Sequence, residues 1–343
     1  MKKIKVGLNG FGRIGRAFAR IALSRDTFDL VVINTRKTQN SMMSYLLQYD
    51  SVYRTFGKVV KEETDGISIE GKKILTLLND KPENIPWNKY QVDVVVDATG
   101  AFPKKPDLEK HLKGSVKKVI LSAPAKDEET PFVVQGVNDS KFDFKKESII
   151  SMASCTTNCA APMFKVINDN FKVVSGFLTT VHAITISQSM LDDANKNEGR
   201  SRAAFTNIIP STTGAAKAVA RVIPELKGKV DGMALRVPIA TGSITDISAI
   251  VEKHVTAEEV NKVFKEASLG AMKEVLRYEN KILVSSDYIG SPFSCIFDAN
   301  YTKVINGLPA QAGNLVKIFG WYDNEWGYST RLVDLVEKLT NYV

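Results

Sequence analysis

Cysteine and histidine are scarce in this chain of 343 residues, which contains three of each. Three cysteines are too few for a disulfide framework, and no second close cysteine pair accompanies Cys155 and Cys159 to complete a structural zinc site. We therefore expect no metal site and a reducing, cytoplasmic compartment. Long apolar runs are also missing. The charged start Met1-Lys2-Lys3 leads directly into a short strand, so the sequence predicts neither a signal peptide nor a membrane span.

Acidic residues are outnumbered by basic ones, 38 against 46, which gives a formal net charge of +8. This excess favours anionic partners such as phosphorylated metabolites, nucleotides or nucleic acid. The short basic runs lack interleaved aromatic residues, so we interpret them as solvated surface and do not expect nucleic acid as a partner. His111 and His254 lie among charged neighbours and give no indication of a site.

Strands and helices alternate in the first half of the chain. Strands are predicted at 4–9, 30–34, 92–97 and 116–121, helices at 12–24 and 41–47, and a hairpin at 67–74. Such alternation predicts a parallel sheet with helices on both faces, the α/β Rossmann-type architecture. After residue 154 the strands become longer, at 173–183, 230–238, 243–252 and 294–298, with helices at 214–222 and 257–265. This second pattern predicts an α+β domain with a mixed, largely antiparallel sheet, and 330–339 predicts an amphipathic closing helix.

The glycine pattern Gly10-Phe11-Gly12-Arg13-Ile14-Gly15 follows a predicted strand and opens a predicted helix. Glycine there permits a tight turn and lets the backbone approach a pyrophosphate, whose charge meets the helix N-terminus. We therefore predict a dinucleotide site, the alternative being a turn that only packs helix against strand. The second strand ends in Thr35-Arg36-Lys37 without the carboxylate that binds adenosine ribose hydroxyls. Arg36 and Lys37 suit a 2′-phosphate, or they are solvent-facing loop charges.

Cys155 lies where an apolar strand gives way to an amphipathic helix, in Ser154-Cys155-Thr156-Thr157-Asn158-Cys159. Unpaired N–H groups and the helix dipole stabilise a thiolate at such a position, so Cys155 is a candidate nucleophile. The alternative is a small buried residue. His182, at the end of a strand, could act as a base because its ordinary pKa is near neutral, the alternative being a hydrogen-bonded core histidine. A cysteine hydrolase could use the same pair, but it would have no use for the dinucleotide loop.

Five further segments accompany these two motifs in a fixed order. They are Ser122-Ala123-Pro124, Thr179-Thr180-Val181-His182-Ala183-Ile184-Thr185, Ser211-Thr212-Thr213-Gly214-Ala215-Ala216-Lys217, Leu235-Arg236-Val237-Pro238 and Trp321-Tyr322-Asp323-Asn324-Glu325-Trp326-Gly327-Tyr328-Ser329. Together the motifs resemble the phosphorylating glyceraldehyde-3-phosphate dehydrogenase family over essentially the whole chain. The resemblance implies a dinucleotide-binding domain at 1–154, a catalytic domain at 155–319, and a closing segment at 320–343 that packs back on the first domain. It also implies a homotetramer, with the loop 187–202 near a subunit interface.

The activity that the resemblance implies is the NAD(P)-dependent oxidation and phosphorylation of glyceraldehyde 3-phosphate, with Cys155 as nucleophile and His182 as base. Implied phosphate ligands are Thr185 and Arg236 for the substrate, and Ser154, Thr156, Thr213, Gly214 and Arg200 for inorganic phosphate, with Arg202 as the alternative to Arg200. Implied cofactor contacts are Asn9, Gly10, Gly12, Arg13, Ile14, Thr35, Arg36, Thr99, Gly100, Ser122, Asn324 and Tyr328. Erythrose-4-phosphate dehydrogenase and a noncatalytic role in binding nucleic acid or protein are the alternatives.

Several positions depart from the family pattern. Thr35 replaces the usual Asp after the second strand, and Asp193-Ala194 stands where NAD-specific relatives often carry Leu-Pro. Both changes resemble the NADP-using or dual-cofactor branch. Asp80 replaces an Arg common near the adenine and argues the other way. We therefore expect NAD or NADP, with a preference for NADP or dual use.

Overall fold

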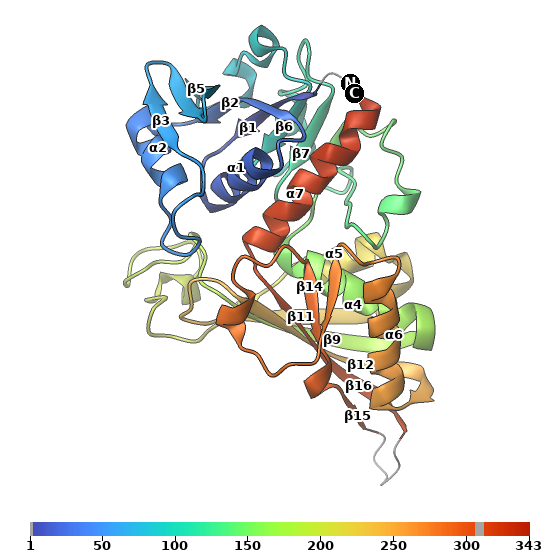
Figure 1. Ribbon diagram of the computed structural model, residues 1–343. Coiled ribbons are helices and arrows are strands. Elements are labelled where there is room, and N and C mark those ends of the chain that lie inside the picture. The colour runs from blue at the N-terminus through green and yellow to red at the C-terminus, as the bar shows by residue number, and fades with distance from the viewer. Residues whose placement is uncertain (1–2, 306–311) are drawn as a thin grey trace. The chain divides into compact units, whose positions relative to one another are not determined.

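The computed structural model describes residues 3–305 and 312–343, so small parts of both predicted domains lie outside the described residues. The chain forms two compact units (Figure 1). The first contains the described residues up to Val133, then Lys141–Ser154 and Ser329–Val343. The second contains Val134–Ser140 and the described residues of Cys155–Tyr328. No helix among the described residues is long and apolar enough to cross a membrane.

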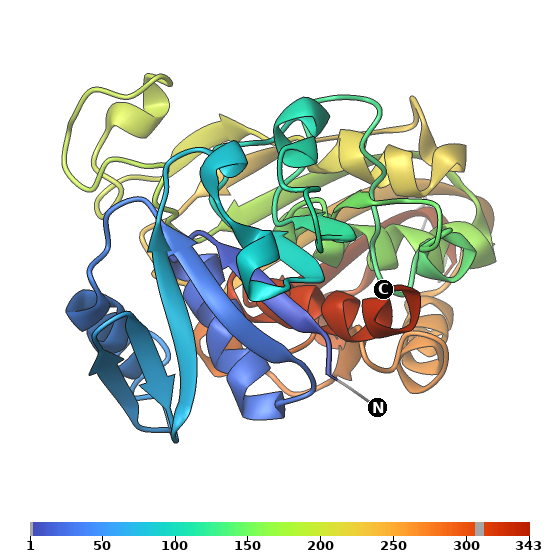
Figure 2. The same cartoon turned by 90° about the horizontal axis from the view of Figure 1, so that it is seen from above.

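The first unit is built on an eight-stranded sheet in the order β3-β4-β5-β2-β1-β6-β7-β8. Its strands are β1 Lys5–Asn9, β2 Asp29–Thr35, β3 Val60–Glu63, β4 Gly66–Ile69, β5 Lys72–Leu78, β6 Val94–Asp97, β7 Lys118–Leu121 and β8 Ile149–Ser151. All pairs from β5 to β8 are parallel, which confirms the predicted Rossmann-type sheet. β3, β4 and β5 pair antiparallel, as the predicted hairpin requires. Figure 2 shows these strands with α2 at one edge of the unit.

Apolar runs explain the central strands of this sheet. β6 and β7 are buried along their whole length, as expected for parallel strands covered on both faces. The helices are α1 Arg13–Arg25, α2 Asn40–Gln48, α3 Lys105–Glu109 and the larger part of α7 Trp326–Leu339. α7 contacts α1 through ion pairs from Arg25 to Asp334 at 2.5 Å and Glu337 at 3.1 Å.

The second unit contains a mixed sheet in the order β10-β11-β9-β12-β16-β14-β13, with β15 paired to β16. Its strands are β9 Val173–His182, β10 Ile209–Thr212, β11 Val230–Arg236, β12 Ser243–Val255, β13 Leu276–Glu279, β14 Cys295–Asp298, β15 Lys303–Ile305 and β16 Gly313–Tyr322. Only the pairs β9–β11 and β13–β14 are parallel among these described strands. The sheet is therefore mixed and largely antiparallel, as predicted.

Three α-helices of this unit pack on the sheet: α4 Cys155–Phe171, α5 Ala215–Val222 and α6 Ala257–Leu269 (Figure 1). α4 lies between the other two and contacts β9, β12, β14 and β16. Short 3₁₀ turns complete the described chain: η1 Pro82–Asn84, η2 Trp87–Tyr90, η3 Asp139–Lys141, η4 Gly199–Ser201, η5 Pro224–Leu226, η6 Ser285–Tyr288, η7 Ala299–Tyr301 and η8 Thr340–Tyr342.

The strand β16 was not predicted, and its last three residues fall in the range 320–343 given above to the closing segment. The strand continues to Tyr322, and α7 begins only at Trp326. α4 packs so close to β16 that only glycine fits at position 320. A Cβ on Gly320 would lie 2.5 Å from the Met163 sulfur. A glycine within a strand weakens the sequence pattern from which strands are predicted.

Candidate active site

The first turn of α4 carries Cys155. The strand β8 ends at Ser151, and the connection bends sharply because Ala153 adopts a left-handed φ of 53°. The Ser151 hydroxyl stabilises this bend: it accepts the Ala153 N–H at 3.1 Å and donates to the Ala123 carbonyl at 2.7 Å. Apolar residues then recur at helical spacing, including Cys159 and Met163, and bury α4 against its sheet.

His182 ends β9 and lies beside the thiol. Its Nε2 is 3.4 Å from the Cys155 sulfur, and its side chain is buried. The parallel pairing of β9 with β11 places Arg236 directly opposite His182. The Arg236 Nη1 is 2.7 Å from the His182 Nδ1, and the Ala183 carbonyl oxygen is also 2.7 Å from Nδ1. Two neighbours therefore compete for one ring nitrogen.

The two neighbours of Nδ1 favour opposite tautomers of His182. The Ala183 carbonyl accepts a proton held on Nδ1, which leaves Nε2 as an acceptor for the Cys155 thiol. The Arg236 guanidinium can only donate, so it favours the tautomer with the proton on Nε2. A ligand that draws Arg236 away from Nδ1 therefore favours the form in which Nε2 can take the thiol proton.

Burial dominates the ionisation of the pair. It raises the pKa of Cys155 to about 11, although the Arg236 charge and hydrogen bonds at Thr156 act in the opposite direction. It lowers the pKa of His182 to about 3, with further lowering by the charges of Arg236 and Arg200. The effect of desolvation on the Cys155 pKa is thus larger than that of the helix N-terminus, which the sequence predicted would stabilise a thiolate. Cys155 and His182 are therefore both neutral in this state.

Tyr322 joins α4 to the strand that carries His182. Its hydroxyl is 2.9 Å from the Thr156 Oγ1 and 2.8 Å from the Thr180 Oγ1. Its ring packs edge-on to His182 with the centroids 6.1 Å apart. Burial raises the pKa of Tyr322, so the phenol stays protonated. The sequence motif 321–329 contains Tyr322 but gives no indication of these contacts.

Asn324 is oriented by hydroxyl groups. Its Oδ1 accepts from Ser243 at 2.9 Å and from Thr241 at 3.2 Å. Ser243 in turn accepts the Ala183 N–H at 3.1 Å, so this cluster adjoins the His182 strand end. With its oxygen engaged in this way, Asn324 presents its amide NH₂ as the donor. Tyr328, four residues further along the chain, is also buried. Burial raises the pKa of its hydroxyl, and the charge of a Cys155 thiolate would raise it further.

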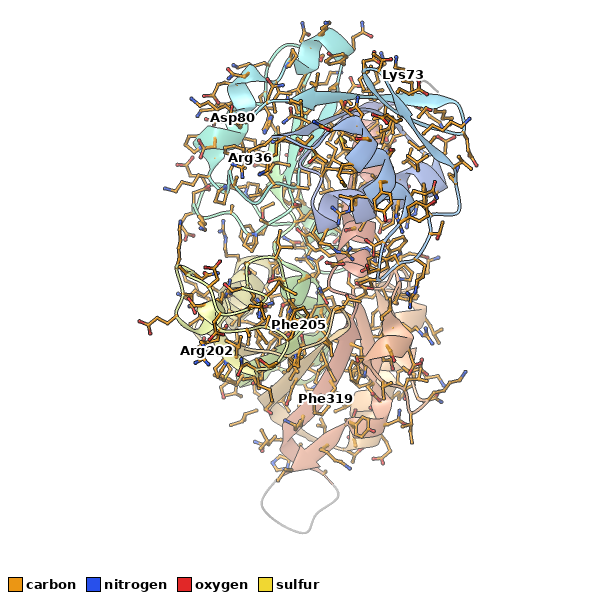
Figure 3. The ribbon with its side chains drawn as sticks, turned by 90° about the vertical axis from the view of Figure 1, so that its left-hand side faces the viewer. Arg36, Lys73, Asp80, Arg202, Phe205 and Phe319 are labelled. Atoms are coloured by element: carbon orange, nitrogen blue, oxygen red, sulfur yellow. The ribbon has the colours of Figure 1, made fainter. Side chains whose placement is uncertain are left out.

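Hydroxyls and guanidinium groups gather beside the Cys155–His182 pair. The Arg200 Nη1 donates to Ser187 at 3.1 Å, and the Ser187 and Thr185 hydroxyls are 2.9 Å apart. Arg202 instead pairs with Asp192 at 3.0 Å on the exposed loop (Figure 3). Of the two arginines that the sequence left open, Arg200 is thus the one close enough to His182 and Arg236 to lower both of their pKa values.

The remaining predicted phosphate ligands lie at two helix starts. Ser154 immediately precedes α4, and Thr156 lies in its first turn. Thr213 accepts the Ala215 N–H at 3.2 Å, and Gly214 directly precedes α5. Both helix N-termini present backbone N–H groups suited to an anion.

The predicted cofactor loop lies in the first unit. Gly10 has a φ of 103°, and a Cβ on it would lie 2.8 Å from the Ala98 backbone, so only glycine fits. Gly12 precedes the N-terminus of α1, where Arg13 forms an ion pair with Asp50 and the Ile14 carbonyl accepts from Ser329. This strand, turn and helix N-terminus form a cradle that fits a pyrophosphate.

Other predicted cofactor residues follow neighbouring strands of that sheet. Thr35 is buried at the end of β2, with its hydroxyl 3.0 Å from that of Thr38. Arg36 is exposed beyond it, and Figure 3 shows it together with Asp80, which follows β5. Thr99 and Gly100 are exposed after β6, and Ser122 follows β7. The carboxyl ends of β2, β6 and β7 thus carry these predicted cofactor residues, and Asn9 and Gly10 lie at the carboxyl end of β1.

A Rossmann-type unit joined to a unit in which a partly buried cysteine lies beside a buried histidine fits one class of protein, the nicotinamide-dependent oxidoreductases. Sequence comparison supplies the family. Residues 4–105 match the NAD binding domain of glyceraldehyde 3-phosphate dehydrogenase, and residues 154–324 match the C-terminal domain of the same family. The chain belongs to the glyceraldehyde 3-phosphate dehydrogenase family, which confirms the resemblance drawn from the motifs.

Full-length relatives agree with these domain matches. The chain is 49% identical over 340 residues to glyceraldehyde-3-phosphate dehydrogenase of Streptomyces coelicolor, covering 98% of this chain and 99% of the relative. It is 48% identical over 339 residues to glyceraldehyde-3-phosphate dehydrogenase 2 of Streptomyces avermitilis, with the same coverage. The enzyme of Geobacillus stearothermophilus is 48% identical over 338 residues, or 98% of each chain. The similarity therefore extends through both units.

Proposed function

We propose that this protein oxidises D-glyceraldehyde 3-phosphate and phosphorylates the product to 1,3-bisphosphoglycerate, as a glycolytic or gluconeogenic enzyme. The names of its relatives support this substrate. The observation that carries the proposal is the 3.4 Å distance between the Cys155 sulfur and the His182 Nε2, beside Arg236. Such a pair can form a nucleophile and later accept the proton of the bound intermediate.

The proposed reaction begins at Cys155. Its sulfur bonds to the aldehyde carbon while His182 moves the thiol proton to the carbonyl oxygen, which gives a thiohemiacetal. His182 Nε2 then takes the hydroxyl proton as the carbon–hydrogen bond breaks. A bound nicotinamide dinucleotide supplies the hydride acceptor for this oxidation. Phosphate next attacks the resulting thioester, the carbon–sulfur bond breaks, and the thiolate recovers a proton from His182.

Two anion sites are part of this proposal. Thr185 and Arg236 bind the substrate phosphate, and Ser154, Thr156, Thr213, Gly214 and Arg200 bind inorganic phosphate. The contacts from Arg200 to Ser187 and from Ser187 to Thr185 support a close relation between the two sites. Guanidinium groups, hydroxyls and helix N-termini are the donors that phosphate oxygens require.

The proposed cofactor contacts in the first unit are Asn9, Gly10, Gly12, Arg13, Ile14, Thr35, Arg36, Thr99, Gly100 and Ser122, and in the second Asn324 and Tyr328. The cradle at Gly10 supports a dinucleotide, and the donor amide of Asn324 suits a carboxamide oxygen. We further propose NADP or dual use, since Thr35 leaves no carboxylate to repel a 2′-phosphate and Arg36 is exposed to receive one. At least a tenfold preference for NAD in matched kinetics would contradict this preference.

A homotetramer in the cytoplasm completes the proposal. Large apolar side chains are exposed in and beside the loop 187–202, including Ile186 at 84% and Leu191 at 74%. Exposed apolar groups of this size are typical of a protein interface. Sedimentation equilibrium tests the assembly, and a monomer at micromolar concentration would contradict it.

The deciding experiment follows absorbance of the reduced nicotinamide with glyceraldehyde 3-phosphate, comparing NAD and NADP, each with and without inorganic phosphate. Turnover that depends on phosphate supports the proposed reaction. Faster turnover of erythrose 4-phosphate without phosphate would favour the alternative dehydrogenase. The Cys155→Ser variant must lose aldehyde oxidation, and activity retained by it would contradict the role of Cys155.

A further inference from the structure

One buried carboxylate lies between the two loops proposed to bind the cofactor. The Asp97 Oδ1 accepts the backbone N–H and the hydroxyl of Thr99, at 3.0 and 2.7 Å. The Asp97 Oδ2 accepts from the Asn9 Nδ2 at 2.8 Å and lies 3.2 Å from the His111 Nε2. Asp97 and His111 are 0% exposed. Both carboxylate oxygens are therefore engaged by donors of the protein, away from competing water.

Trp87 fixes the tautomer of His111. An indole N–H can only donate, and the Trp87 Nε1 is 3.0 Å from the His111 Nδ1. Nδ1 therefore accepts, which places the ring proton on Nε2 facing the Asp97 Oδ2. The hydrogen bonds run in one direction from Trp87 through His111 to Asp97. All three side chains are buried, so this direction is held by the fold.

The bonding continues from Asp97 across the neighbouring strand ends. The Asn9 Oδ1 accepts from the Asn34 Nδ2 at 2.8 Å, which links the carboxyl ends of β1 and β2. Backbone hydrogen bonds connect the same strand ends. Gly10 N donates to the Asn34 carbonyl at 2.9 Å, and Ala98 N donates to the Asn9 carbonyl at 2.7 Å. The space that a Cβ on Gly10 would need is taken by Ala98 and Thr99. The loops after β1 and β6 are thus in direct contact.

We propose that His111 is a positioning residue for the dinucleotide, acting through Asp97. By holding Asp97, it sets the spacing between the loop at Asn9-Gly10 and the loop at Thr99-Gly100. The inference rests on the proposed function in taking these two loops as cofactor contacts. Loss of the His111–Asp97 bond leaves the carboxylate free to shift, so the loops no longer match the cofactor before it binds. Cofactor affinity then falls, whereas turnover at saturating cofactor does not.

Two amide substitutions separate this role from general support of the fold. In His111→Gln the amide reaches the position of Nε2 and can still donate to Asp97. In His111→Asn the amide reaches only the position of Nδ1, where it can accept from Trp87 but cannot meet Asp97. Both variants remove the imidazole ring and one of its two hydrogen bonds, so they are matched controls for packing.

The measurement is calorimetric titration of the full-length protein with NAD, well below each variant's melting temperature. One hydrogen bond to a charged group corresponds to roughly a tenfold effect, so we expect His111→Asn to bind NAD about tenfold more weakly than wild type. We expect His111→Gln to stay within about threefold, and kcat at saturating NAD to stay within about twofold in both variants. Equal NAD affinity in the two variants would overturn the positioning role alone. Failure of the wild-type protein to bind either NAD or NADP would contradict the proposed function and the positioning role together.

A second measurement needs no substitution and decides the question if His111→Asn does not fold. With only three histidines in the chain, ¹⁵N-labelled histidine gives an assignable spectrum of the wild-type protein. His111 should show a protonated Nε2 and an unprotonated Nδ1, and its Nε2 resonance should shift when NAD binds. A protonated Nδ1, or a His111 signal unchanged at saturating NAD, would overturn the inference.

Discussion

Replacing Tyr322 by phenylalanine should both destabilise the protein and slow its nucleophile. The lost hydroxyl makes two buried hydrogen bonds, at 2.9 Å to Thr156 and 2.8 Å to Thr180. At roughly 0.5–1.5 kcal/mol each, their loss lowers the free energy of unfolding by about 1–3 kcal/mol. Because Thr156 lies in the turn that carries Cys155, and Thr180 lies two residues before His182, we also expect slower alkylation of Cys155 by iodoacetamide.

The chain offers a matched control in Tyr288. Tyr288 and Tyr322 are each 1% exposed, but the Tyr288 hydroxyl has no hydrogen-bond partner within the part of the chain that the structure describes. Tyr288→Phe removes a buried polar group that pays a desolvation cost, so it should leave stability unchanged or raise it by up to about 1 kcal/mol. Urea unfolding at 25 °C compares the two variants with wild type. Equal losses in both would refute the role given to the Tyr322 hydroxyl.

Three further substitutions test the electrostatics of the fold. The folded pKa of His182, about 3, lies below its ordinary value of 6.5, so the unfolded chain binds the extra proton and stability falls as pH drops from about 6.5 to 3, by roughly 1.4 kcal/mol per unit. His182→Gln should remove this pH dependence of the free energy of unfolding, measured by urea unfolding at successive pH values. The same substitution at exposed His254 is the control. An unchanged slope in His182→Gln would contradict the lowered pKa of His182. In a His182→Gln background, where Arg236 no longer acts on an imidazole, Arg236→Gln removes a charge that lowers the pKa of Cys155, so alkylation at pH 8 should slow several-fold, and a faster rate would be inconsistent with that charge effect. Lys118→Met deprives the carbonyls of Phe144, Lys145 and Glu147 of an ammonium donor at 2.7–3.2 Å, and should cost about 2 kcal/mol in the same unfolding assay; no loss would show that desolvation of the charge cancels these bonds.

Local signals predicted the features that depend on neighbouring residues. The Gly10 turn needs a left-handed φ and a close approach to Ala98, and only glycine meets both demands. The buried apolar runs of β6 and β7 likewise specify a parallel sheet from within each strand. These elements could be predicted because the physical requirement and the residues that meet it lie in the same short segment.

Contacts between residues that are far apart in the sequence could not be predicted from local patterns. His182 and Arg236 are 54 residues apart, and only the parallel register of β9 with β11 brings them together. His111 seemed an ordinary residue among charged neighbours, yet it is fully buried between Trp87 and Asp97. The charged residues next to His111 in the sequence do not indicate that it contacts Trp87 and Asp97. The role of Tyr322 was hidden in the same way, since its two hydroxyl partners lie on two other elements.

The neutral state of Cys155 and His182 is a property of the pair. Burial opposes a lone thiolate and a lone imidazolium, but moving the proton from the sulfur to Nε2 leaves the net charge of the buried pair unchanged. The Arg236 charge next to Nδ1 opposes the imidazolium that this transfer creates. An anion that binds Arg236 neutralises that opposition and frees Nδ1 for the Ala183 carbonyl. Anion binding at Arg236 and formation of the nucleophile are therefore linked through a single ring nitrogen of His182.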